Sequence, residues 1–272
     1  MDLGLKGKNA LITGGGSGIG LGISRVLAGE GMNIAIASRN PPGEAIKEIE
    51  ALGVKCIKIN ADLSHEEDCS RMAAEAVGAF GRLDAYINNA AWTWHQPVTK
   101  ITSEAFGDTI NTNLRACVLS CRDISKHMIE NGGGNICIIG STVRLFAAYS
   151  EASYRISKMG LSMYMETLAI ELAPHNIRVN MITPGFFRTK MVAHISEEAV
   201  GDLIGMTPAR RAGRPDEIGN AVAFVISDKV SGFTIGRDLI VDGGVTLNPL
   251  GRPGFDAIKA MNMQEEGVSE ER

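Results

Sequence analysis

Short apolar runs alternate with helix-length amphipathic stretches along most of this sequence, and that alternation restricts the possible folds more than any other feature. Several of the apolar runs are continuous, as in strands that are covered on both faces. Strands are predicted at residues 10–13, 33–37, 55–59, 85–87, 135–139, 178–182 and 238–241. Helices are predicted at residues 18–30, 43–52, 65–80, 105–130, 153–172 and 216–227. Repeated strand–helix units of this kind predict an α/β fold with a parallel, doubly wound sheet.

The chain is predicted to form one domain over residues 1–250, because no break in composition and no long linker divides it. Residues 184–215 contain several Gly, Pro and Arg residues but no predicted strand. We expect a long loop there, with room for short helices, and loops of that length are either functional or disordered. We expect this loop to contact the substrate. Residues 251–272 are predicted to be a C-terminal tail with a frayed, charged end.

Charge and composition exclude several classes of function. The formal net charge is -4 and the basic residues are scattered, which argues against a nucleic-acid partner. No apolar run approaches the ~20 residues that cross a membrane, and the first residues lack the pattern of a signal peptide. The five cysteines contain no CxxC pair, so we expect reduced, buried thiols, and the five histidines form no metal-ligand cluster. These features predict a metal-free cytoplasmic protein that does not enter a membrane.

A glycine-rich run, TGGGSGIG at residues 13–20, follows the first predicted strand and leads directly into a helix. Glycines let the backbone turn sharply and let a pyrophosphate approach the main chain. The start of the helix presents free N–H groups to the same anion. The position of the run between a strand and a helix predicts a dinucleotide-binding turn.

The end of the second predicted strand decides between the two nicotinamide cofactors. An acidic side chain at that point binds the ribose 2′-hydroxyl of NAD(H), whereas an arginine suits the 2′-phosphate of NADP(H). The sequence there is Ala37-Ser38-Arg39-Asn40, without a carboxylate. We therefore expect Arg39 to bind the 2′-phosphate of NADP(H), together with Ser38 and Asn40. The alternative is that Arg39 is a solvated loop residue and that NAD(H) binds.

Tyr154 and Lys158 are four residues apart in a predicted helix, so their side chains leave the same face as neighbours. A free tyrosine has a pKa near ~10, and a close positive charge stabilises the phenolate and lowers that pKa. Ser141, thirteen residues upstream of Tyr154, can hydrogen-bond the same substrate oxygen. Together with a nucleotide-binding turn, this group predicts a proton donor and acceptor for carbonyl and alcohol chemistry.

Five segments of the sequence resemble, in order and spacing, the motifs of the short-chain dehydrogenase/reductase family. They are the glycine turn, Asn88-Asn89-Ala90-Ala91, Ser141, Tyr154 with Lys158, and Pro184-Gly185. The resemblance covers residues 6–244 and departs from the family at Ala91, where the family has glycine. It implies a Rossmann-type three-layer αβα sandwich with a mostly parallel seven-stranded sheet. It also implies a nicotinamide cofactor and a homotetramer or dimer.

The same resemblance implies roles for individual residues. Cofactor contacts are assigned to Gly14, Ser17, Gly18, Ile19, Gly20, Asp62, Leu63, Asn89, Ala90, Tyr154, Lys158, Pro184, Gly185 and Thr189. Tyr154 is the general acid and base, and Ser141 hydrogen-bonds the reacting oxygen. Lys158 lowers the pKa of the phenol and holds the nicotinamide ribose. Asn113, with Asn111 as the alternative, completes the catalytic set by holding a water that connects Lys158 to solvent.

Substrate pockets in this fold are built from the loops beyond the carboxyl ends of the strands. The candidates in those loops are Trp92, Trp94, His95, Val143, Arg144, Leu145, Phe146, Tyr149, Phe186, Phe187, Arg188 and Met191. Their aromatic and apolar character favours a small molecule such as a sugar, polyol, steroid or cyclic alcohol and its ketone, and the two arginines suit an acid group on it. Two alternatives stay open: a 3-oxoacyl-[acyl-carrier-protein] reductase, and an NADP(H)-sensing regulator without activity.

Overall fold

The computed structural model describes residues 1–189 and 196–248. Its centre is a seven-stranded sheet in the order β3-β2-β1-β4-β5-β6-β7, in which every neighbouring pair is parallel. The strands are β1 (Asn9–Thr13), β2 (Asn33–Ser38), β3 (Cys56–Asn60), β4 (Ala85–Asn88), β5 (Gly134–Ile139), β6 (Ile177–Pro184) and β7 (Asp238–Val241). Each coincides with a predicted strand to within two residues at either end.

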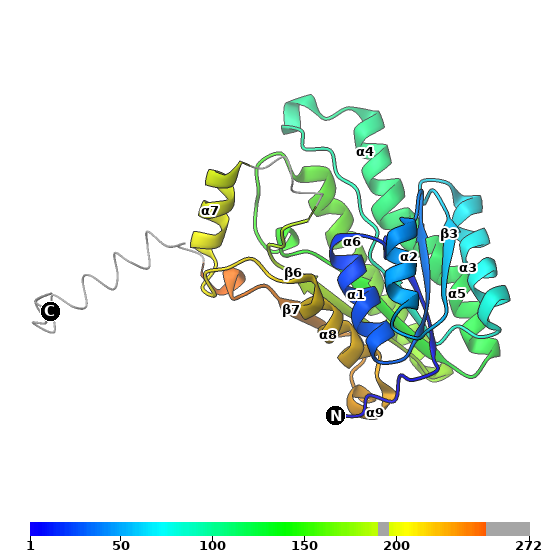
Figure 1. Ribbon diagram of the computed structural model, residues 1–272. Helices are drawn as coiled ribbons and strands as arrows, with labels where there is room; N and C mark the ends of the chain where they lie inside the picture. The colour runs from blue at the N-terminus through cyan, green and yellow to red at the C-terminus, as the bar shows by residue number, and fades with distance from the viewer. Residues whose placement is uncertain (190–195, 249–272) are drawn as a thin grey trace, which may run out of the picture.

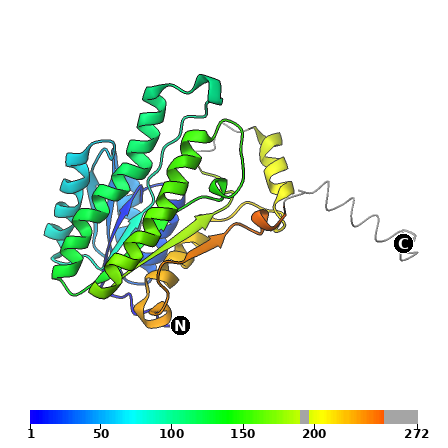
Figure 2. The same ribbon diagram turned by 180° about the vertical axis from the view of Figure 1, so that it is seen from behind.

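Helices cover both faces of this sheet. One face is covered by α1 (Gly18–Gly29), α2 (Gly43–Glu50) and α8 (Pro215–Ile226), as Figure 1 shows. The other is covered by α3 (Glu66–Phe80), α5 (Ala116–Glu130) and α6 (Ala152–Leu172), which Figure 2 shows from behind. The shorter helices are α4 (Ser103–Ile110), α7 (Glu197–Met206) and α9 (Asp228–Ser231). The predicted three-layer, doubly wound Rossmann-type fold is confirmed, and the sheet is wholly parallel.

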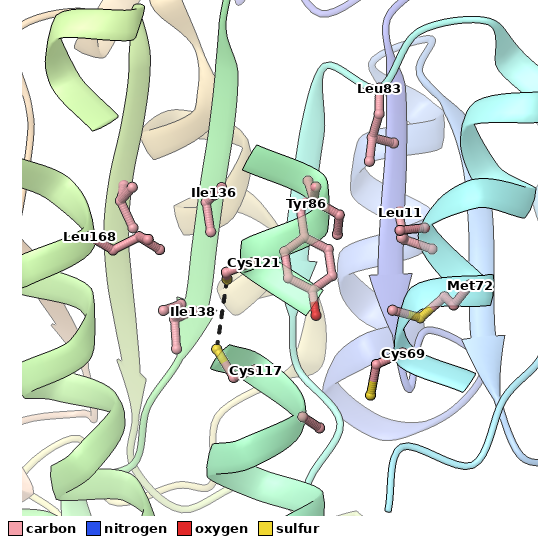
Figure 3. Close-up of a cluster of buried hydrophobic side chains, with 14 of the residues drawn as sticks. Leu11, Cys69, Met72, Leu83, Tyr86, Cys117, Cys121, Ile136, Ile138 and Leu168 are labelled. Carbon is pink, nitrogen blue, oxygen red and sulfur yellow. Dashed lines mark hydrogen bonds between the residues drawn. The ribbon is translucent and has the colours of Figure 1, made fainter. Parts of the chain in front are cut away.

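The sheet face under α3, α5 and α6 carries a continuous core of buried side chains (Figure 3). Leu11 of β1 and Tyr86 of β4 are fully buried there. The Tyr86 hydroxyl donates a hydrogen bond to Asn88 Oδ1 at 3.0 Å, so its burial leaves no polar atom without a partner. Cys117 and Cys121 lie one turn apart on α5 with their sulfur atoms 3.9 Å apart. All five cysteines are buried free thiols, as predicted.

The strand order reverses at β1, because β2 and β3 extend the sheet on one side and β4 to β7 extend it on the other. In open α/β sheets a ligand crevice forms at such a reversal, beyond the carboxyl ends of the strands. β1 ends at Thr13 and β4 ends at Asn88. The segments that follow these two strands meet there, since Asn89 Nδ2 donates a hydrogen bond to the Thr13 carbonyl oxygen at 2.9 Å.

The predicted helix at residues 105–130 contains a turn of different geometry in the structure. α4 ends at Ile110, α5 begins at Ala116, and Asn111–Arg115 form a π-helical turn that joins them without a gap. Within this turn the side chain of Asn113 bonds to Trp92 and to Ser157, both outside this helix. Turns of this type occur frequently at functional sites. The prediction of a helix over this range is confirmed, whereas the π turn was not predicted.

The predicted long loop at residues 184–215 contains α7, in agreement with the expectation of short helices. The Ser196 hydroxyl caps α7 by accepting a hydrogen bond from Ala199 N at 3.2 Å. A parallel bridge joins Phe187, near the start of the loop, to Gly213 near its end. Residues 190–195, among them the candidate Met191, lie outside the described residues, as does the predicted tail from residue 249 onward.

Candidate active site

A cleft of about 800 Å³ opens at the carboxyl ends of the central strands. Its volume lies in the range of pockets that hold cofactors and small ligands. The predicted cofactor residues that line it are Gly14, Ser17, Gly18, Ile19, Gly20, Ser38, Arg39, Asp62, Leu63, Asn89, Ala90, Tyr154, Lys158, Pro184, Gly185 and Thr189. The predicted catalytic residues that line it are Ser141, Tyr154 and Lys158. Asn40 and Asn113 are not part of the lining.

The glycine turn lies between β1 and α1, and its geometry favours glycine at several positions, of which Gly14 and Gly20 are the clearest. Gly14 has a φ of +67°, in the left-handed region. A Cβ on Gly20 would lie 2.1 Å from the Gly14 carbonyl oxygen, so no side chain fits there. Asn89 supports the turn from the β4 side through its backbone N–H as well, which donates to Thr13 Oγ1 at 2.9 Å. The result is a supported backbone cradle at the start of a helix, which suits a phosphate group.

Ser38, Arg39 and Asp62 lie together at the end of the cleft that follows β2 and β3. Burial works against ionisation of Asp62, but hydrogen bonds from Ser64 and the nearby charge of Arg39 lower its pKa overall. Arg39 lies over the indole of Trp92, with its guanidinium carbon 5.8 Å from the ring centroid. This end of the cleft therefore presents a fixed positive charge next to an aromatic surface.

Tyr154 and Lys158 reach the cleft from the first turns of α6, one helical turn apart as predicted. Lys158 is only 2% exposed, and its Nζ donates a hydrogen bond to the Ile139 carbonyl oxygen at 2.8 Å. The same Nζ lies 5.6 Å from the centroid of the Tyr154 ring, where a cation is attracted to the aromatic face. The fold thus holds an ammonium group beside the phenol.

Burial dominates the protonation of this pair. It raises the pKa of Tyr154 to about 12, although a hydrogen bond with Ser141 acts in the opposite direction. It lowers the pKa of Lys158 from 10.5 to about 8. The prediction that Lys158 lowers the pKa of the phenol is therefore wrong for this structure. The physical reason is that the phenol is removed from water, and that the ammonium donates its hydrogen bond to the Ile139 carbonyl oxygen.

Ser141 follows β5 and begins the short 3₁₀ turn Thr142–Arg144. Its Oγ accepts a long hydrogen bond from Val143 N at 3.4 Å and also shares a hydrogen bond with Tyr154. The serine hydroxyl and the phenol thus meet in the cleft, as predicted, from β5 and from α6. Two hydroxyl groups arranged in this way can both bond to one oxygen atom of a ligand.

Asn113 is buried, and its carboxamide holds the loop after β4 against α6. Its Oδ1 accepts a hydrogen bond from Trp92 N at 2.7 Å. Its Nδ2 donates to the Trp92 carbonyl oxygen at 2.8 Å and to Ser157 Oγ at 3.0 Å. Through these contacts the carboxamide positions Trp92 and Ser157, the residue before Lys158.

The predicted substrate residues divide into two groups. Those that line the cleft are Trp92, His95, Val143, Phe146, Tyr149, Phe186 and Phe187. Those that do not are Trp94, Arg144, Leu145 and Arg188. Arg144 is buried in an ion pair with Asp238 of β7, and Arg188 pairs with Glu197 of α7 at 2.9 Å. Both arginines are neutralised outside the lining, so the expected cationic contribution to the pocket is wrong.

Glu151, just before α6, lines the cleft although no motif predicted it. Its Oε1 lies 2.8 Å from Nδ1 of His95, so the pair joins the loop after β4 to the loop before α6. Burial is the main cause of the high pKa of Tyr154, and the charge of Glu151 adds to it. Leu203 and Thr207, at the end of α7, were missed as well. The only signal for Glu151 was its position three residues before Tyr154.

Fold and site together define a class of protein. A glycine cradle at the reversal point of a doubly wound sheet, with a Ser–Tyr–Lys group in the same cleft, is the arrangement of a dinucleotide-binding oxidoreductase.

Within residues 1–189 and 196–248, no group of three or more His, Cys, Asp and Glu side chains could hold a metal ion. Among the helices of those same residues, none has the length and apolar character that a membrane span needs.

Comparison with known proteins identifies the family. A family model described as enoyl-(acyl carrier protein) reductase matches residues 14–246. A 3-oxoacyl-[acyl-carrier-protein] reductase, FabG, of Staphylococcus epidermidis is 32% identical over 243 residues, 88% of this chain and 99% of that protein. An uncharacterized oxidoreductase of Mycobacterium tuberculosis is 35% identical over 257 residues, 92% of this chain and 96% of that protein. The chain belongs to the short-chain dehydrogenase/reductase family, as its motifs predicted.

Solved structures agree with this assignment. A short-chain type dehydrogenase/reductase from Mycobacterium marinum has a TM-score of 0.84 at 29% identity, with 89% of this chain and 96% of that chain covered. A short chain dehydrogenase from Burkholderia cenocepacia in complex with NADP has a TM-score of 0.83 at 30% identity, with 89% and 98% covered. The similarity extends over nearly the whole of each chain, so the fold is shared.

Proposed function

We propose that the protein is an NADP(H)-dependent oxidoreductase that interconverts a secondary alcohol and a ketone. The observation that supports this most directly is the meeting of Ser141, Tyr154 and Lys158 with the glycine turn in one cleft. Membership of the family supplies the coarser part of the statement, an oxidoreductase that uses a nicotinamide cofactor. The chain's own residues supply the finer part, which is the choice of cofactor and the role of each group.

The cofactor, when bound, supplies or accepts a hydride. In reduction Tyr154 donates a proton to the carbonyl oxygen, and in oxidation its phenolate removes the alcohol proton. Ser141 hydrogen-bonds the same oxygen and stabilises the charge that develops on it. Lys158 holds the nicotinamide ribose. Because burial keeps the pKa of Tyr154 near 12, the phenol is protonated at neutral pH, which suits the proton donor of the reductive direction.

The residues of the cleft fit this cofactor. The glycine turn lines the cleft at the start of α1, where the free backbone N–H groups of a helix can bind a pyrophosphate. The ammonium of Lys158 supplies donors for ribose hydroxyl groups. At the far end, Arg39 supplies a cation for a 2′-phosphate, and no carboxylate follows β2 directly to bind a 2′-hydroxyl.

Replacing Arg39 with alanine is expected to weaken NADPH binding by about 10- to 100-fold and to leave NADH binding within about threefold. A hydrogen bond to a charged group contributes about 1.5–3 kcal/mol, and only NADPH carries the 2′-phosphate. Calorimetric titration with each cofactor measures both dissociation constants. Arg122→Ala, at an arginine of α5 outside the cleft, is the matched control and should change neither constant. If Arg39→Ala weakened the binding of NADPH and NADH by the same factor, Arg39 would not be the residue that binds the 2′-phosphate.

For the substrate we propose a sugar, polyol, steroid or cyclic alcohol. Trp92, Phe146 and Phe187 give the cleft aromatic walls, which pack well against a ring. His95 and Glu151 add a polar corner, and a carboxylate accepts hydrogen bonds from hydroxyl groups. The combination of aromatic walls and the carboxylate of Glu151 supports a neutral, hydroxyl-bearing or cyclic substrate.

The second candidate is a 3-oxoacyl-[acyl-carrier-protein] reductase, which is favoured by the names of relatives 29% and 32% identical. Recognition of an acidic carrier protein needs basic residues near the end of α5. Arg122 already forms ion pairs with Glu66 and Asp123, at 3.4 and 2.8 Å, and Lys126, which is more exposed, lies 3.7 Å from Asp123. This pairing supports the small-molecule substrate as the first candidate.

One absorbance assay distinguishes these two candidates from each other and from a third, an NADP(H)-sensing regulator without activity. NADPH oxidation is followed with a panel of sugar, steroid and cyclic ketones and, in parallel, with a 3-oxoacyl carrier protein; NADP-dependent oxidation of the alcohols is tested as well. We expect turnover on at least one cyclic or sugar ketone. Turnover confined to the carrier-bound thioester would favour the second candidate. Silence on every substrate, with NADPH still bound, would favour a regulator that senses NADP(H) without activity.

We also propose that the chain self-associates, as a homotetramer or a dimer, through α6. Ile156, Met163 and Ile170 are spaced seven residues apart on this helix and are 53%, 67% and 77% exposed. A row of exposed apolar side chains along one helix is typical of an interface. Met165 of the same helix is buried in the core and is not part of this row. A mass from light scattering gives the number of chains.

A further inference from the structure

The contact between Arg39 and Trp92 joins two segments that are far apart in the sequence. Arg39 follows β2, Trp92 follows β4, and both line the cleft on opposite sides of the glycine turn that follows β1. The guanidinium carbon lies 5.8 Å from the centroid of the indole, within the range of a cation–π contact. Trp92 is thus in position to orient the one arginine at this end of the cleft.

The backbone of Trp92 is fixed by both of its polar groups. Its N–H donates to Asn113 Oδ1 at 2.7 Å, and its carbonyl oxygen accepts from Asn113 Nδ2 at 2.8 Å. Its ring meets Trp94 edge to face, with the centroids 5.9 Å apart, and Trp94 Nε1 donates to Asp108 Oδ2 at 3.4 Å. The indole is therefore a supported surface although it is 42% exposed.

A guanidinium that rests on an aromatic face keeps its N–H donors free in its own plane. Those donors form the fork that binds a phosphate through two parallel hydrogen bonds. Asp62 is the nearby acidic group, but its Oδ1 already accepts hydrogen bonds from Ser64 N and Ser64 Oγ, at 3.0 and 2.7 Å. In the part of the chain that the structure describes, the Arg39 guanidinium forms a cation–π contact with Trp92 and interacts electrostatically with Asp62.

We infer that Trp92 is a positioning residue for cofactor discrimination, because its cation–π contact orients the Arg39 guanidinium and leaves the N–H donors of that group available to the 2′-phosphate of NADP(H). The inference rests on the proposed choice of NADP(H) as the cofactor. An arginine that is already oriented loses less side-chain freedom when the phosphate binds, and the gain is confined to the cofactor that carries this phosphate. Trp92 thereby acts through Arg39 and does not take part in the chemistry.

Trp92→Ala is expected to weaken NADPH binding by about 3- to 10-fold and to leave NADH binding within about twofold. Trp92→Phe keeps an aromatic face and should bind NADPH within about threefold of the wild type. Calorimetric titration of both cofactors with each variant gives the ratio of the two dissociation constants. A merely structural role would weaken both cofactors together and leave that ratio unchanged, which would overturn the inference.

A double-mutant cycle with Arg39→Ala locates the effect. In the Arg39→Ala protein, adding Trp92→Ala should not weaken NADPH binding further; an additive loss would show that Trp92 acts independently of Arg39 and would overturn the inference. If Arg39→Ala alone leaves the NADPH to NADH ratio unchanged, the assignment of the 2′-phosphate fails and this inference fails with it. If Arg39→Ala changes the ratio and Trp92→Ala does not, only the inference fails.

Fluorescence offers a second readout that needs no substrate. The chain has two tryptophans, so in a Trp94→Phe variant Trp92 is the only one. Adenosine 2′,5′-bisphosphate, which carries the 2′-phosphate, is expected to change the emission of Trp92 as Arg39 engages the phosphate. Adenosine 5′-monophosphate should change it much less. Equal responses to the two nucleotides would contradict a link between Trp92 and phosphate recognition.

Discussion

Replacing Tyr154 with phenylalanine is expected to lower turnover by about 10²- to 10⁴-fold while NADPH binding changes by less than about threefold. The substitution removes only the hydroxyl, which supplies the proton and shares a hydrogen bond with Ser141. The ring stays, and it is the ring that Lys158 contacts, with Nζ 5.6 Å from the centroid. Because the glycine turn and Lys158 are untouched, the loss should appear in the chemical step and not in cofactor binding.

Single-turnover oxidation of NADPH, with the best ketone from the substrate panel, measures the chemical step, and calorimetry measures binding. Tyr164→Phe is the matched control. Tyr164 lies on the same helix outside the cleft, with its hydroxyl 3.4 Å from the Val118 carbonyl oxygen that it donates to. Its variant should keep turnover within about threefold of the wild type. Turnover at the wild-type rate in Tyr154→Phe would remove Tyr154 from the mechanism.

The strands and the glycine turn could be predicted because each is specified by neighbouring residues. A continuous apolar run with polar residues at its ends is sufficient for a parallel strand that is covered on both faces, and β1 and β5 have that form. The turn after Thr13 needs only glycines and a helix start. Helical spacing also predicted that Tyr154 and Lys158 share one face of α6, which the structure confirms.

The features that the sequence did not predict depend on contacts between distant residues. The π-helical turn between α4 and α5 goes with hydrogen bonds between Asn113 and both Trp92 and Ser157, and no local pattern marks such partners. Glu151 joins the cleft next to His95, which comes from another loop. Arg144 is withdrawn from it by an ion pair with Asp238 on β7. In each case tertiary geometry selects the partner, and spacing along the chain does not encode it.

The protonation of Tyr154 and Lys158 could not be predicted from their spacing in the sequence either. Spacing predicts that Tyr154 and Lys158 are neighbours, and a cation beside a phenol stabilises the phenolate. Burial acts against the charged form of both groups, and its depth is a property of the whole fold. Because Lys158 is only 2% exposed, burial lowers its pKa to about 8. The protein therefore holds an ammonium group in a place that disfavours its charge.

Replacing Lys158 with methionine is expected to abolish turnover and yet to raise the free energy of unfolding at pH 7 by about 1–2 kcal/mol. Methionine has a similar length but no charge. The difference between a pKa of 10.5 in water and about 8 in the folded protein corresponds to about 3 kcal/mol of destabilisation by the buried ammonium. Loss of the hydrogen bond to the Ile139 carbonyl oxygen offsets roughly 1 kcal/mol of the gain.

The gain in stability should depend on pH in one direction. Below a pH of about 8 the lysine is protonated in both the folded and the unfolded chain, so the full destabilisation is present. As the pH rises from about 8 towards 10.5, the folded protein loses the proton first. The wild type then gains stability, and the difference between the two proteins shrinks. Urea unfolding of both proteins near pH 7 and at about pH 9.5 measures this change.

Lys126→Met is the control, because Lys126 of α5 has a side chain that is 70% exposed, and its stability should change by less than about 0.5 kcal/mol at either pH. Two results would contradict the conclusion that burial lowers the pKa of Lys158 and destabilises the folded protein. One is a Lys158→Met protein that is less stable than the wild type at pH 7, and the other is an equal gain in stability at both pH values. A gain in stability together with lost turnover would mean that Lys158 destabilises the folded protein and is required for activity. The unfolding measurement therefore tests the active site before any substrate is known.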